Sequence, residues 1–364
     1  MFRPIRPARA RARIGLAAAA ATLSTAALST AGWSEEYQYG YTAANGYGAG
    51  APRSAAPGYS APAYATAPRA PSYSDGAPPV SRGYGGVQSP SGRGYTVSGR
   101  LEYETLVNRD HSTGFAYGDV TFGFMSPSGP FGFELGFEGY QAGEGDIAPY
   151  GAVKFDTGAG VVSAGVPRSS MDTFLDIPAI GGSQREDLAV GALTRGTVGT
   201  SYLSGADTPW GLRYDGSFGQ AALSGSVHQF EGDGTVVDGT IHVQTGMFTL
   251  SAGAENVDRT EGRSGVNIVT GAKVATGIWE GGLYYSDVQR PDKMTGWTGY
   301  GRWAPGGPVA VTGTLISKRE SGETDTLYGL SGEYTFWEGA YLQGGFFDGE
   351  DTKATYDISM GWKF

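Results

Sequence analysis

Apolar and polar residues alternate with a period of two through most of residues 95–364. The first such segment, TVSGRLEYETLVN, has a largely apolar face made by Val97, Leu101, Tyr103, Thr105 and Val107. Its charged residues fall on the opposite face: Arg100, Glu102 and Glu104. Alternation over segments of about ten residues is typical of β-strands with one apolar face and one polar face.

The alternation predicts sixteen strands. They are expected at residues 95–108, 117–125, 131–139, 148–156, 159–166, 208–217, 220–230, 235–243, 246–255, 264–274, 277–286, 295–303, 307–317, 325–335, 339–347 and 354–364. Short connections such as PSGP and TGAG alternate with longer charged ones such as NVDRTEGRSG and DVQRPDKMTG. An even strand number, with short turns at one end and long polar loops at the other, is typical of a bacterial transmembrane β-barrel.

Aromatic and charged residues support a barrel over a soluble sandwich or propeller. An interfacial girdle is expected from the aromatic residues assigned to the short turns: Phe124, Phe131, Trp210, Phe218, Phe248, Trp279, Trp303, Phe336 and Trp337. Nearly every polar strand face also carries charge, which a packed core could hold only at a severe desolvation cost. A water-filled lumen can hold it. We therefore predict an all-β fold, a 16-stranded antiparallel transmembrane β-barrel.

One connection is far longer than the others. Residues 167–208 separate the fifth and sixth predicted strands. Structureless loops longer than about 15 residues are usually functional or disordered. This one contains apolar residues such as Met171, Phe174 and Leu175, which favour burial over contact with water. We predict that this third long loop folds inward and constricts the lumen.

The N-terminal 94 residues differ in composition from the predicted barrel. Residues 1–32 join an arginine-rich start to an apolar run and a small-residue site, which is typical of a secretory signal peptide. Residues 33–94 consist mainly of Gly, Ala, Pro, Ser and Tyr, and are expected to form a disordered linker in the periplasm. A structural tether between the barrel and the cell wall is an alternative role for this linker.

Charge and histidine content exclude other functions. Residues 1–94 hold nine of the 26 basic and three of the 36 acidic residues, which leaves 17 basic and 33 acidic residues, a net charge of −16, for the barrel region. Such an acidic domain argues against nucleic acid as a partner. Of the histidines, His111 falls in a predicted loop, and His228 and His242 are expected about 15 Å apart in the lumen. No nucleophile–base pair is evident, so no catalytic residue and no cofactor is predicted.

The end of the chain and the order of elements carry a family resemblance. The last strand alternates apolar residues up to the terminus: Tyr356, Ile358, Met360, Trp362 and Phe364. This pattern resembles the signal that the outer-membrane assembly machinery reads. Sixteen strands, a long loop after the fifth, the SGR at 98–100 and the final KF resemble the general diffusion porins of Gram-negative bacteria, in particular the alphaproteobacterial type.

The resemblance implies a location, an assembly and a constriction. It implies a homotrimer among the lipids of the cell outer membrane. It also implies that acids on the third loop face basic side chains of the wall. The loop acids would be Asp172, Asp176, Glu186 and Asp187. The wall cations would be Arg100, Lys154, Arg213 and Arg302, with Lys363 as a further candidate.

The predicted function is passive diffusion of small hydrophilic solutes and ions through a water-filled pore. The acidic barrel region favours a modest preference for cations, although outer-loop acids could instead bind a divalent cation. A substrate-specific channel, for example one for sugars, is the alternative. Four inward aromatic residues could form a sugar path for such a channel: Tyr284, Tyr300, Tyr341 and Phe347.

Overall fold

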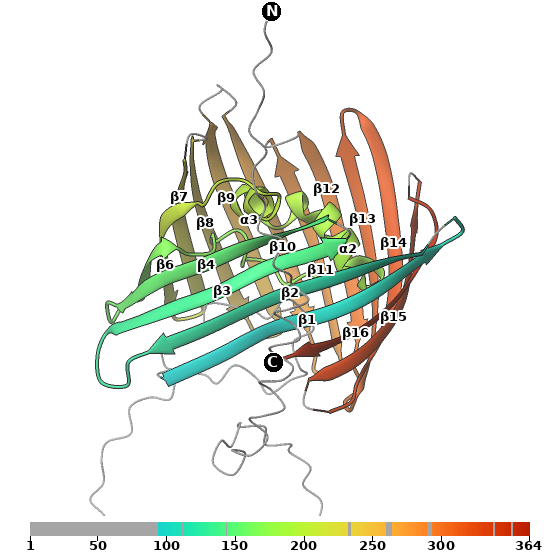
Figure 1. Ribbon diagram of the computed structural model, residues 1–364, viewed down its shortest axis with the longest axis horizontal. Helices are drawn as coiled ribbons and strands as arrows, with labels where there is room; N and C mark the ends of the chain where they lie inside the picture. The colour runs from blue at the N-terminus through green and yellow to red at the C-terminus, as the bar shows by residue number, and fades with distance from the viewer. Residues whose placement is uncertain are drawn as a thin grey trace, which may run out of the picture. The chain divides into compact units, whose positions relative to one another are not determined.

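The computed structural model describes residues 94–110, 112–142, 144–231, 234–259, 264–289, 293–337, 339–350 and 352–364. In these ranges the chain forms one closed antiparallel sheet, with consecutive strands paired and β1 paired with β16 (Figure 1). The predicted signal peptide at 1–32 and nearly all of the predicted linker lie outside the described residues, as does His111.

The described ranges contain sixteen strands. They are β1 (Gly94–Asn108), β2 (Ser112–Met125), β3 (Phe131–Ala142), β4 (Glu144–Asp156), β5 (Val161–Val166), β6 (Trp210–Phe218), β7 (Ala221–Phe230), β8 (Gly234–Thr245), β9 (Phe248–Arg259), β10 (Gly265–Ala275), β11 (Trp279–Val288), β12 (Met294–Trp303), β13 (Val309–Glu320), β14 (Glu323–Thr335), β15 (Ala340–Gly349) and β16 (Thr355–Lys363). This confirms the closed 16-stranded antiparallel barrel predicted from the alternation.

The two ends of the chain's barrel region meet where the sheet closes. Arg100 lies opposite Lys363 in the β1–β16 pair. The backbone N–H of Gly99 donates to the carbonyl oxygen of Phe364 at 2.7 Å, and the N–H of Phe364 donates back to Gly99 at 3.1 Å. Gly94 and Phe364 therefore lie at the same end of the barrel, which we call the turn end; the opposite end is the loop end.

Most loop-end connections are shorter than the sequence suggested. The charged segment QAGEGD lies almost wholly in β3 and β4, and KRESGETD lies almost wholly in β13 and β14. In water both faces of a strand tolerate charge, so the hydrogen-bonded ladder continues after the apolar alternation has stopped. The prediction of long loops at this end was wrong for these connections, and residues 167–209 are the exception.

Outward and inward residues alternate as predicted along the strands. In β16, Tyr356, Ile358 and Met360 are 60, 61 and 61% exposed, whereas Asp357 between them is 1% exposed. Glu102 and Glu104 of β1 are likewise buried on the inner face. Trp210 differs from the predicted girdle, because it begins β6 at the end of that strand remote from the short turn at 219–220.

The connection between β5 and β6, residues 167–209, contains the described helices. It holds η2 (Ile180–Gly182), α2 (Gln184–Ala189), η3 (Gly191–Leu193) and α3 (Gly196–Leu203). Ser183 caps α2 by accepting a hydrogen bond from the N–H of Glu186, and Glu186 and Asp187 place negative charge in its first turn. Over the described residues, none of these helices has the length and apolarity needed to cross a membrane.

Candidate functional site: a segment inside the barrel

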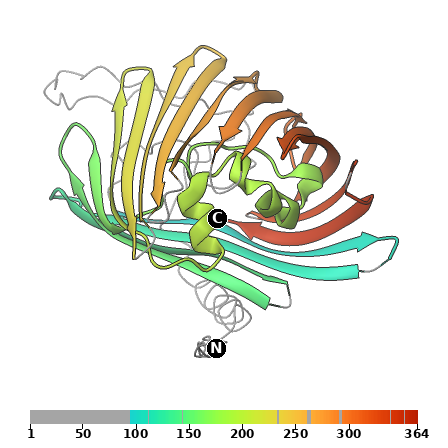
Figure 2. The same cartoon turned by 90° about the horizontal axis from the view of Figure 1, so that it is seen from above.

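Residues 167–209, which we call the inner segment, lie within the ring of strands in Figure 2. Hydrogen bonds join this segment to strands on different sides of the barrel. Ser183 Oγ donates to Glu104 of β1 at 2.9 Å, and the N–H of Thr197 donates to Glu255 of β9 at 2.7 Å. The inner segment therefore spans between separate parts of the wall.

Two arginines of the inner segment bind acids on the wall formed by β2 and β3. Arg168 pairs with Asp119 and Glu138, and its guanidinium lies 4.4 Å from the ring centre of Tyr150 on β4. Arg195 pairs with Glu138 and, at 2.8 Å, with Asp172. Burial lowers the pKa of Arg195, but the charges of Asp172 and Glu138 raise it well above its usual value, so the guanidinium stays protonated.

Glycines allow the inner segment to approach β14 and β15 closely. A Cβ added to Gly345 would lie 1.7 Å from the carbonyl oxygen of Gly181, and one added to Gly329 would lie 2.4 Å from the Gly181 nitrogen. Such separations leave no room for a side chain. Nearby, Gln343 Nε2 donates to the carbonyl oxygen of Gly182 at 2.8 Å. Backbone packs against backbone at this contact.

Apolar side chains of the inner segment pack against β10, β11 and β12 of the wall. Met171, Phe174, Leu175 and Ile177 form one buried cluster with three wall residues, Val269, Tyr284 and Tyr300. Phe347 belongs to a second cluster that includes Ile180 and Leu193 of the segment. Tyr341 is also buried, and its hydroxyl donates to Glu102 at 2.7 Å. Three of the four aromatic residues considered for a sugar path thus pack in clusters with the inner segment.

The four predicted loop acids have different surroundings. Asp172 binds Arg168 and Arg195, both within the inner segment. Asp176 lies within electrostatic reach of Arg302. Burial raises the pKa of the Glu186 carboxyl, and the charges of Arg185 and Lys318 partly offset that rise. Asp187 is buried and lines a hollow next to β1.

Most of the predicted wall cations are paired with neighbouring acids. Lys154 pairs with Glu134. Arg213 pairs with Asp215 at 2.7 Å and donates to the carbonyl oxygens of Arg168 and Ser169 at 3.2 and 3.1 Å. Arg302 is buried on β12, in register with Glu280 of β11. Lys363 pairs with Glu333 at 2.5 Å.

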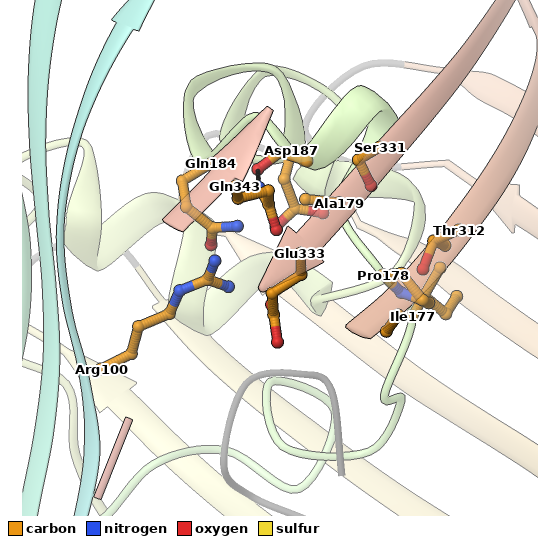
Figure 3. Close-up of a pocket in the computed structure, with 12 residues that line it drawn as sticks. Arg100, Ile177, Pro178, Ala179, Gln184, Asp187, Thr312, Ser331, Glu333 and Gln343 are labelled. Carbon is orange, nitrogen blue, oxygen red and sulfur yellow. Dashed lines mark hydrogen bonds between the residues drawn. The ribbon is translucent and has the colours of Figure 1, made fainter. Parts of the chain in front are cut away.

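Arg100 and Asp187 are brought to one hollow between the inner segment and the wall (Figure 3). The hollow is lined by Arg100, Ile177, Pro178, Ala179, Gly182, Gln184, Asp187, Ala310, Thr312, Ser331, Glu333 and Gln343. Arg100 Nε donates to the Tyr341 hydroxyl at 2.7 Å and lies 2.6 Å from Glu102. A cation, two carboxylates and two amides therefore surround this space.

Sequence reasoning missed Glu333, Gln184 and Gln343 as lining residues. The alternation of β14 and β15 places Glu333 and Gln343 inside, but it carries no information on which inner residues meet the segment. Gln184 is the first residue of α2, directly after the cap at Ser183. Its capping pattern, SQRE, predicts a helix start but not its position in the lumen.

Two of the histidines, His228 and His242, lie within hydrogen-bonding distance of oxygen atoms inside the barrel. His228 Nε2 lies 2.9 Å from the carbonyl oxygen of Pro167, and His242 Nδ1 lies 2.9 Å from Ser251 Oγ. Among the residues that the structure describes, no group of three or more His, Asp or Glu side chains is arranged to hold a metal ion.

The closed barrel of sixteen strands is similar in fold to solved porin structures. Two solved structures show this likeness. An engineered variant of the porin of Rhodopseudomonas blastica has 16% sequence identity and a TM-score of 0.58, over 74% of this chain and 100% of that chain. A porin refined at 1.8 Å resolution has 18% identity and a TM-score of 0.56 over the same shares. No family model and no curated protein matches the sequence.

Proposed function

We propose that this chain is an outer-membrane porin through which small hydrophilic solutes and ions diffuse, with a modest preference for cations. The observation that carries the proposal is the contrast between the two faces of one closed sheet. The outer face offers apolar side chains to lipid, and the inner face carries charged ones around a space too wide for strand side chains alone to fill. Passive diffusion requires no catalytic residue and no cofactor.

The inner segment sets the size limit in this proposal. It spans the lumen and packs against β10 to β12 through apolar side chains, whereas the hollow beside β1 is lined by Arg100, Asp187 and Glu333. The proposed constriction lies at this hollow, with Asp187 as the acid that faces the wall cation. The other predicted constriction residues change the electrostatic field at this hollow through the ion pairs that they form.

The loop end of the barrel supports the preference for cations. Acidic residues outnumber basic ones at the ends of the strands there. Among the residues that the structure describes, the acids are Asp110, Asp146, Glu231, Asp258, Asp287, Glu320, Glu323, Asp325, Asp348 and Glu350, and the bases are Arg109, Arg259, Lys293, Lys318, Arg319 and Lys353. A negative mouth concentrates cations and repels anions.

A planar-bilayer experiment tests the proposed channel and its selectivity. With a KCl gradient across the bilayer, the purified full chain should give discrete current steps and a reversal potential displaced toward that of potassium. Asp187→Asn should move the reversal potential toward zero, since it removes a negative charge from the hollow. Asp187→Glu, which keeps the negative charge in the hollow, is the control. A reversal potential that favours chloride in the unmodified protein would contradict the cation preference.

The last strand of the barrel supports a proposal for how the protein is inserted and assembled in the outer membrane. We propose that the outward residues of β16, together with Trp362 and Phe364, form the signal for the outer-membrane assembly machinery, and that the mature barrel is a homotrimer surrounded by outer-membrane lipids. Gly94 lies at the turn end, so an outer-membrane barrel with its short turns in the periplasm would keep the preceding linker there as well.

A further inference from the structure

The guanidinium of Arg100 is held at the hollow through only one of its three nitrogens. Arg100 is 8% exposed, and its Nε donates to the Tyr341 hydroxyl at 2.7 Å and lies 2.6 Å from Glu102. The Tyr341 hydroxyl in turn donates to Glu102 at 2.7 Å, and the guanidinium carbon lies 5.2 Å from the centre of the Tyr341 ring. These contacts fix the orientation of the Arg100 side chain.

The two terminal nitrogens of Arg100 remain available to a ligand. Among the residues that the structure describes, none accepts a hydrogen bond from Nη1 or Nη2 of Arg100. In Figure 3 the guanidinium end of Arg100 points from β1 into the space among the lining side chains. Two parallel N–H groups of a guanidinium match the two oxygens of a carboxylate, a bidentate contact that an ammonium group does not make. The geometry at Arg100 therefore suits a carboxylate ligand.

Negative charge lies on other parts of the same hollow. Asp187 of α2 and Glu333 of β14 both line it, and both are 8% exposed. A solute with only a negative charge would meet these two carboxylates, and a solute with only a positive charge would meet Arg100. A zwitterion can place each of its two charges beside a side chain of opposite sign. The hollow therefore matches a solute that carries both charges.

The neutral lining residues indicate what lies between the two charges of such a solute. Polar groups come from two amides and two hydroxyls, those of Gln184, Gln343, Thr312 and Ser331. Both kinds of group donate and accept hydrogen bonds, so they suit an ammonium group as well as a carboxylate. Apolar contacts come from Ile177, Pro178, Ala179 and Ala310. A short apolar group on the solute can pack against this part of the lining.

We propose that the hollow binds small zwitterionic amino acids during their passage, with the carboxylate on the guanidinium of Arg100 and the ammonium group beside Asp187. The proposal rests on the proposed channel function, because the hollow is then part of the solute path. It names the class of solute for which the constriction has a binding site. Uncharged solutes still pass, since their diffusion requires neither contact.

Saturation-transfer NMR on the purified full chain in detergent tests the site without requiring a channel. L-Alanine at neutral pH is compared with propionate, which lacks the ammonium group, and with ethylammonium, which lacks the carboxylate. Alanine should bind about tenfold more tightly than either compound, the effect of one additional hydrogen bond between charged groups. Equal binding of the three compounds by the unmodified protein would overturn the proposal.

Two variants assign the contacts within the hollow. Arg100→Lys keeps the positive charge but loses the bidentate geometry, so it should weaken alanine binding about tenfold. Asp187→Asn leaves every strand unchanged and should weaken the binding of alanine but not of propionate, whereas a general disturbance of the hollow would weaken both. Lys273→Gln is the control, because Lys273 lies 3.9 Å from Glu280 on the wall and does not line the hollow. Unchanged alanine binding in both folded variants would overturn the proposal.

Planar bilayers show whether the binding site lies on the conduction path. Alanine should reduce the single-channel conductance in KCl, and the reduction should saturate over the concentrations at which NMR detects binding. Alanine that binds but leaves the current steps unchanged would overturn its proposed place on the solute path. Binding in detergent with no current steps in any protein would support the site and refute the proposed channel. Current steps with no preference for alanine would support the channel and overturn the site.

Discussion

Replacing Gly345 with alanine is expected to displace the inner segment from β15 and to enlarge the single-channel conductance. The added Cβ would lie 1.7 Å from the carbonyl oxygen of Gly181 and 2.7 Å from its carbon, and both are backbone atoms that have no rotamer to change. Overpacking of this kind costs about 1–3 kcal/mol. That cost would shift the ratio of docked to displaced segment by roughly 5- to 150-fold.

The control for this substitution is the neighbouring glycine. A Cβ on Gly344 would have its nearest neighbour, the carbonyl oxygen of Asp357, at 4.0 Å. Gly344→Ala should therefore conduct like the unmodified protein in planar bilayers. If folded Gly345→Ala gave the same step size as Gly344→Ala, the close packing of the inner segment against β15 would not limit the pore.

Leu330→Arg is expected to destabilise the barrel in lipid by about 2–4 kcal/mol, the cost of a lipid-facing arginine near the middle of the bilayer. Leu330 lies on the outer face of β14 and is exposed, with Tyr328 and Tyr334 on the same face on either side. The charge would have to stay in hydrocarbon or reach toward the surface at a conformational cost. Reversible urea unfolding in lipid vesicles measures the loss of unfolding free energy.

Thr324→Arg provides the comparison at another depth. Thr324 is exposed on β14 near the loop end, where the cost of an outward arginine falls to about 0–1 kcal/mol. Equal losses of unfolding free energy for Leu330→Arg and Thr324→Arg would mean that depth in a membrane does not determine the cost of an outward arginine. An unfolding free energy that Leu330→Arg leaves unchanged would mean that this face does not meet lipid tails.

The strands were predictable because one face of each strand is mainly apolar and the other face is mainly polar. In β16 the alternation between Ile358 or Met360 and Asp357 or Ser359 follows the hydrogen-bonded backbone without interruption. The strand ends were less predictable. Beyond the apolar band, as in the segment KRESGETD, backbone pairing continues while the residues already have the composition of a loop.

The site was predictable only in part, because its contacts join residues far apart in the chain. Alternation places Glu104 and Glu138 inside the barrel, but it cannot show that Glu104 meets Ser183 or that Glu138 meets Arg195. Arginines of the inner segment bind acids of the β2–β3 wall here, which is the reverse of the pairing of segment acids with wall cations that the resemblance implied. The packing of the segment decides these partners, and periodicity carries no signal for it.

Swelling of liposomes that contain the purified full chain tests the central claim most directly. The claim is that the closed wall meets lipid outside and holds a solvent path inside. In a series of uncharged sugars of increasing size, the swelling rate should be high for the smallest and fall steeply with size, whatever the stereochemistry of the sugar. Swelling with none of the sugars, from liposomes in which the barrel is inserted and folded, would contradict the account.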